Sequence, residues 1–165
     1  MTRPLLVVAH EATRTGAPRV LLDLMRFARG RITVPVAVRL VAEGPLSRDL
    51  RDLADTEVDL VAPCAVLVNG SAAAGMLHGV QPGTPTMAYV HEEQAALEVL
   101  PKECIEALVD RCDRVLRVSE RSAATLGELG IDASRIRVLP PAVPARPRHP
   151  PPRTPDSCAT WDSSP

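Results

Sequence analysis

Polar side chains that suit ligand binding follow four of the hydrophobic runs in this sequence. The first run is followed by His10 and Glu11, and three later runs are followed by Asn69, His91 and Ser119. Imidazole, carboxylate, amide and hydroxyl groups all exchange hydrogen bonds with polar ligands. In a parallel sheet the carboxyl ends of the strands share one edge, and α/β proteins bind their ligands there. The sequence therefore predicts a binding site at that edge.

The first of these runs opens a strand–loop–helix unit. Leu5–Ala9 is an unbroken apolar run, typical of a strand that is buried on both faces of a parallel sheet. The chain turns at Gly16, and helical periodicity begins near Pro18, where the missing N–H costs nothing, and ends near Gly30. Free N–H groups and a partial positive charge at the helix start favour an anionic ligand in the preceding loop.

The same alternation of strands and helices continues along the chain. Helical patterns include a short helix capped by Ser47, another capped by Ser71, and a longer one over 93–112 that is interrupted at Pro101. A last helix stops at Gly130. Further strands are expected at residues 33–40, 58–61, 65–68, 86–90, 114–118 and 136–139.

Strands and helices at this spacing predict right-handed crossovers. The expected fold class is therefore α/β, with a Rossmann-like, doubly wound parallel sheet, and residues 1–143 are expected to form this single domain. Residues 144–165 are dominated by proline and small polar residues and show no apolar periodicity. Such a segment buries too little surface to offset its ordering entropy, so we expect a disordered tail.

Composition excludes several classes of function. The formal charge of −1 and the pI near 6.4 argue against a nucleic-acid-binding protein. The four cysteines lack metal-ligand spacing, which indicates free thiols, and no long apolar segment suggests a signal peptide or a membrane span. We expect a cytoplasmic protein with at most peripheral membrane contact. Neither the dinucleotide-binding glycine pattern, nor the P-loop, nor the G-x-S-x-G elbow occurs.

Three stretches, taken in order, resemble the amino-terminal domain of family 4 glycosyltransferases. They are HEATRTGAPRVLLDL, then VLVNGSAAAG with YVHE, and finally DRVLRVSERSAATLGELGIDASRIRVLPPAV, and the resemblance covers about residues 4–143. Such enzymes have two Rossmann-like domains that face each other across a cleft. The resemblance implies retaining transfer of a hexose from a nucleotide-diphosphate sugar, as co-substrate, to a lipid-linked or polysaccharide acceptor. It implies no metal and no other cofactor.

The resemblance also assigns roles to the polar residues. Gly16 matches the glycine whose backbone approaches the donor phosphates and sugar, where a side chain would block the approach. His91 matches the histidine that contacts the transferred sugar, so it is the expected catalytic residue. By the same comparison Asn69 and Ser119 line the cleft, and His10 and Glu11 are placed to bind the acceptor.

Two departures from the family pattern leave alternatives open. The segment between Gly44 and Ala65 is short, and a proline-rich stretch stands where the donor domain, with its acidic E-x7-E motif, should begin. A separate carboxyl-terminal donor domain is therefore an expected partner. A non-catalytic binding or partner module and a truncated remnant are the alternatives. At the residue level, His91 also suits a strand cap and Ser119 a helix N-cap.

Overall fold

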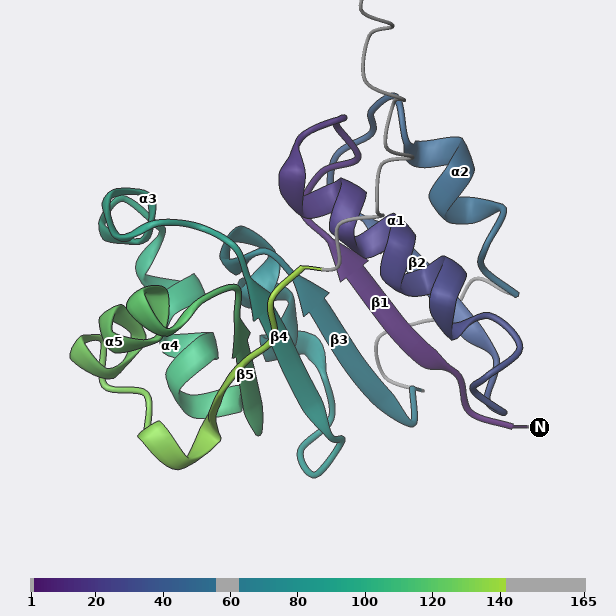
Figure 1. Cartoon of the computed structure of the whole chain (residues 1–165). Helices are drawn as coiled ribbons and strands as arrows, with labels where there is room; N and C mark the ends of the chain where they lie inside the picture. The colour runs from purple at the N-terminus through teal and green to yellow at the C-terminus, as the bar shows by residue number, and fades with distance from the viewer. Residues whose placement is uncertain (1, 56–62, 142–165) are drawn as a thin grey trace, which may run out of the picture.

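Six parallel strands form one sheet in the computed structural model, which describes residues 2–55 and 63–141 (Figure 1). The strand order is β2-β1-β3-β4-β5-β6, and every neighbouring pair is parallel. The strands are β1 (Leu5–Ala9), β2 (Val36–Leu40), β3 (Ala65–Asn69), β4 (Thr86–Val90), β5 (Arg114–Arg117) and β6 (Ile136–Val138).

Helices cover both faces of this sheet, so the predicted doubly wound α/β fold is confirmed. On one face lie α1 (Gly16–Ala28) and α2 (Ser47–Arg51). On the other lie the 3-10 helix η1 (Ser71–Gly79), α3 (Gln94–Glu98), α4 (Lys102–Arg111) and α5 (Glu120–Glu128). Figure 1 shows this division, with α1 and α2 together on one side and α3, α4 and α5 on the other. A short 3-10 turn, η2 (Ala133–Arg135), leads into β6.

Alternating side chains of β1 enter two separate hydrophobic clusters. Leu6 and Val8 pack with η1, α4 and α5, whereas Val7 and Ala9 pack with α1 and α2. Period-two alternation sends neighbouring side chains to opposite faces of a sheet, and both faces are covered here. That is why β1 reads as a continuous apolar run.

Three local predictions were wrong at element boundaries. The second strand begins at Val36 and not at residue 33, because Pro35 lacks an N–H and contributes its carbonyl, which accepts from Leu5 N at 2.9 Å. Ser71 does not cap a helix: Gly70, with φ of 92°, precedes η1, and the Ser71 hydroxyl has no hydrogen-bond partner among the described residues. Ser47 begins α2, and its hydroxyl accepts from Gly44 N at 2.8 Å.

Some predictions fall outside the described residues. These are the small strand at 58–61 and the tail at 144–165. Over residues 2–55 and 63–141, no helix is both long enough and apolar enough to cross a membrane. In the same ranges Cys64, Cys104 and Cys112 are free thiols, as predicted.

Candidate functional site

Three adjacent strands bring the β1 loop and His91 to one edge of the sheet. The strand order places β3 between β1 and β4, and Asn69 is the last residue of β3. Asn69 Nδ2 donates to the Ala17 carbonyl at 3.2 Å, and Asn69 Oδ1 lies 3.0 Å from His91 Nε2. This Ala17–Asn69–His91 chain links the start of α1, next to Gly16, to the residue after β4.

The hydrogen-bond network assigns the tautomer of His91. Because Asn69 Nδ2 donates to Ala17, its oxygen faces His91, and the imidazole must donate through Nε2–H. Burial lowers the pKa of His91 below its ordinary value of 6.5, Glu92 opposes this shift, and Arg117 adds to it. The neutral ring therefore keeps an Nδ1 lone pair, which is available to accept a hydrogen bond from a ligand.

The ring of Tyr89 packs against the imidazole of His91. The two rings lie 4.1 Å apart between centroids at an angle of 42°, and Tyr89 is buried. Its hydroxyl donates to the Leu139 carbonyl at 2.6 Å, just beyond β6. His91 is thus held by a ring contact and by Asn69. Its position is determined by the domain itself before any ligand binds.

Glu92 is a positioning residue that the sequence did not reveal. Its position at the start of a helical pattern indicated only a favourable interaction with the helix dipole. In the structure its carboxylate accepts from Ser71 N at 2.8 Å and from His91 N at 2.9 Å. Gly70 has φ of 92°, and a Cβ there would lie 3.0 Å from Glu92 Oε1. The carboxylate therefore ties the end of β3 to the end of β4.

Gly16 lies in open space at the first turn of α1. A Cβ added to it would meet no atom within 4 Å, and its φ is not in the left-handed region. Within the described residues, nothing in the fold requires glycine at this position. The open surface is compatible with close approach of a ligand to the helix start, where free N–H groups favour anions.

The loop before Gly16 carries the other two predicted residues of this unit. His10 is exposed, and the Glu11 carboxylate accepts hydrogen bonds from the hydroxyls of Thr13 at 2.9 Å and Thr15 at 3.4 Å. Gly44 supports this loop from below, because a Cβ there would lie 2.4 Å from the Ala12 carbonyl oxygen. Both residues thus lie in the loop that leads to Gly16, and the Glu11 carboxylate is hydrogen-bonded to other residues of that loop.

Ser119 and Asn69 are placed differently from one another. Ser119 is exposed and caps α5, accepting from Ser122 N at 3.3 Å, so the N-cap alternative is confirmed. It also lines a pocket of about 300 Å³ together with His91. Asn69 is only 3% exposed, and its side-chain nitrogen and oxygen are hydrogen-bonded to Ala17 and His91, respectively. Asn69 therefore positions His91 from beneath the surface.

A second residue missed in the sequence, Arg117, lines the same pocket. It ends β5, and its side chain is fully buried without a hydrogen-bond partner among the described residues. A signal was present in the sequence: alternation puts Arg117 on the same face as Val115, which belongs to the apolar core. An arginine at such a position is unusual unless something pairs with it.

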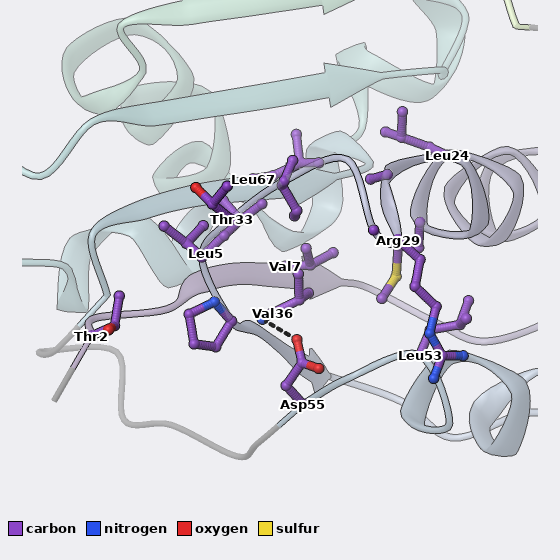
Figure 2. Close-up of a pocket in the computed structure, with 16 residues that line it drawn as sticks. Thr2, Leu5, Val7, Leu24, Arg29, Thr33, Val36, Leu53, Asp55 and Leu67 are labelled. Atoms are coloured by element: carbon purple, nitrogen blue, oxygen red, sulfur yellow. Dashed lines mark hydrogen bonds between the residues drawn. The ribbon is translucent and has the colours of Figure 1, made fainter.

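Two larger hollows lie at the opposite, amino-terminal ends of the strands. One, of about 600 Å³, is shown in Figure 2; it has mostly apolar walls, including Leu5, Val7 and Leu67, and Val36 N donates to Asp55 Oδ2 beside it at 2.8 Å. The other, of about 870 Å³, lies at the amino-terminal ends of β4 and β5. None of the predicted site residues lines either hollow, so size alone does not locate the site.

The architecture and the polar carboxyl edge define an α/β ligand-binding domain of the Rossmann-like class. Residues 6–146 match the family model described as Glycosyltransferase Family 4. The chain therefore belongs to glycosyltransferase family 4, and the match corresponds to the amino-terminal domain of such enzymes. Comparisons with curated proteins and with solved structures found no match.

Proposed function

We propose that this domain forms the acceptor-side half of a retaining glycosyltransferase. In this proposal a hexose passes from a nucleotide-diphosphate sugar to a lipid-linked or polysaccharide acceptor. The donor is held by a second Rossmann-like domain that faces the carboxyl edge of this sheet. The observation that carries the proposal is the Ala17–Asn69–His91 chain, which joins the open loop at Gly16 to a neutral, positioned imidazole.

Each group at the edge has a distinct task in the proposed reaction. The free Nδ1 of His91 accepts a hydrogen bond from a hydroxyl of the transferred hexose and orients that sugar. Gly16 leaves room for the donor phosphates at the start of α1, where the backbone N–H groups stabilise the negative charge of the departing diphosphate. His10 and Glu11 border the same opening and contact acceptor hydroxyls. No step requires a metal ion in this scheme.

The test is donor hydrolysis by a two-domain protein that fuses residues 1–141 to the donor domain of another family 4 enzyme. We expect His91→Ala to lower hydrolysis of the accepted nucleotide-diphosphate hexose about 10²-fold, since one positioned hydrogen bond to the reacting sugar is lost. His78→Ala is the matched control, because His78 lies on η1, its imidazole Nε2 is 3.1 Å from the Glu103 carbonyl oxygen, and it does not line the pocket beside His91. Equal activities of the two variants would remove His91 from the reaction.

The same assay separates the proposal from a non-catalytic binding module. A module of that kind binds the sugar nucleotide without hydrolysing it in the fusion, and its affinity is independent of His91. Residues 1–165 assayed without a donor domain should turn over poorly. Fast turnover by those residues alone would show that the proposed second domain is dispensable.

A further inference from the structure

The last residue of β5, Arg117, places a cation inside the hydrophobic face of the sheet. Its exposed fraction is 0%, and all three guanidinium nitrogens lack a hydrogen-bond partner among the described residues. Its register neighbour on β4, Val90, belongs to the apolar core. Burial lowers the pKa of Arg117 and Glu92 raises it. A guanidinium nonetheless stays protonated in proteins.

The surrounding residues do not neutralise this charge by direct contact. Glu92 is the carboxylate whose charge acts on Arg117, but its two oxygens accept from Ser71 N and His91 N. None of the ion pairs found in residues 2–55 and 63–141 includes Arg117. A buried charge without hydrogen bonds is strongly destabilising, and most proteins avoid it. A ligand anion that pairs with the guanidinium would offset that cost.

The pocket beside Arg117 has the chemistry of an anion site. It opens at the carboxyl ends of β4 and β5, and its walls include Ser119, Ser122 and a second guanidinium, that of Arg121. Glu92 and Glu93 also line it, but the Glu92 carboxylate is occupied by two backbone N–H groups and Glu93 is exposed to solvent. The start of α5 forms one wall and adds its partial positive charge. Arg121 and Gln94 also line this pocket, and both are exposed.

We propose that Arg117 anchors a phosphate group carried by the sugar acceptor. This inference rests on the proposed function and deepens it, because it names the acceptor as a phosphorylated molecule. The forked guanidinium presents two parallel N–H groups, which match two phosphate oxygens. The hydroxyl protons of Ser119 and Ser122 are donated within the α5 cap, so the guanidinium is the main anchor in this proposal. His91 lines the same pocket, so a phosphate held here leaves the body of the acceptor beside the transferred sugar.

Strand spacing separates this phosphate from those of the donor. Ala17, next to Gly16, accepts from Asn69 at the end of β3, and the order β3-β4-β5 puts two strand spacings between Asn69 and Arg117. At about 4.8 Å per spacing the separation is about 10 Å. A diphosphate bound at Gly16 does not reach Arg117, since adjacent phosphates span far less than this distance. The anion at Arg117 therefore belongs to the other substrate.

The experiment measures phosphate binding to residues 1–165 at constant ionic strength. The Arg117 Nε–H NMR signal should shift on addition of inorganic phosphate or glycerol phosphate, and less with acetate or with a nucleoside diphosphate. The thermal midpoint should rise with phosphate in the wild type and in Arg114→Met, the matched control, because Arg114 is exposed on the same strand. Arg117→Met should lose this rise while keeping a midpoint at least equal to that of the phosphate-free wild type.

Three results would overturn the inference. They are an Arg117 signal that phosphate leaves unmoved, an equal phosphate response in Arg117→Met, and a response to the nucleoside diphosphate alone, which would assign the site to the donor. None of these readouts requires sugar transfer. If donor hydrolysis fails in the fusion but phosphate still binds at Arg117, the proposed function is wrong and the anion site stands.

Discussion

At the residue scale, a half-buried imidazole is the group on which the site depends. His91 donates through Nε2 to Asn69, packs on Tyr89, and receives the carboxylate of Glu92 at its own backbone N–H. Asn69 reaches it from the end of β3, whereas Tyr89 and Glu92 flank it in β4 and in the loop that follows. The result is a neutral histidine that presents Nδ1 in one fixed direction. Such preorganisation is worth more in catalysis than an added contact that forms only after binding.

This arrangement predicts a pH dependence of stability. Burial lowers the pKa of His91 below 6.5, so the folded state favours the neutral ring. The contribution to stability is complete above pH 6.5 and is lost as pH falls below it, because the unfolded chain then binds a proton that the folded chain resists. Urea unfolding across this range should show a smaller loss in His91→Gln than in the wild type. A wild-type slope in His91→Gln would mean that the fold does not favour the neutral ring of His91.

At the element scale, the start of α1 has open space next to Gly16, so a small side chain can be added there. Gly16→Ala should raise the free energy of unfolding by about 0.5–1 kcal/mol, because alanine is a better helix former and its Cβ meets nothing within 4 Å. The same change should lower donor hydrolysis by the two-domain fusion, since the methyl group occupies the space that the donor phosphates approach.

Gly127→Ala is the control for that prediction. Gly127 lies in α5, a Cβ there also meets nothing within 4 Å, and it does not line the pocket beside Arg117. It should gain similar stability and keep full hydrolysis. If Gly16→Ala retains full hydrolysis as well, the first loop does not hold the donor phosphates.

At the scale of the whole molecule, much of the fold was predictable from pattern alone. β1 and β4 match their expected bounds because each is a strand signal that follows a proline and ends just before a histidine. The glycine that stops α5 was also identified correctly, and Gly130 has φ of 90°. Errors arose at η1, where small residues support either helical form and where a distant carboxylate, Glu92, binds Ser71 N in place of a cap.

The candidate site was only half predictable, for a physical reason. Strand ends reveal which residues reach the common edge, and that logic correctly brought Asn69 and His91 together near Gly16. It does not reveal which polar groups are already paired within the fold. The Glu92 carboxylate accepts from two backbone N–H groups, whereas the Arg117 guanidinium has no hydrogen-bond partner among the described residues. This difference arises from tertiary contacts between elements far apart in sequence.

The most direct test of the proposed function is an amide NMR titration of the two-domain fusion with nucleotide-diphosphate hexoses, each added separately. We expect the accepted donor to shift the signals of Gly16 and His91 together, because Asn69 couples their two strand ends. Signals from Val36 and Leu53, in the hollow at the opposite end of the sheet, should stay in place. Shifts confined to that hollow, or to only one of Gly16 and His91, would contradict a single sugar-transfer site at the carboxyl edge.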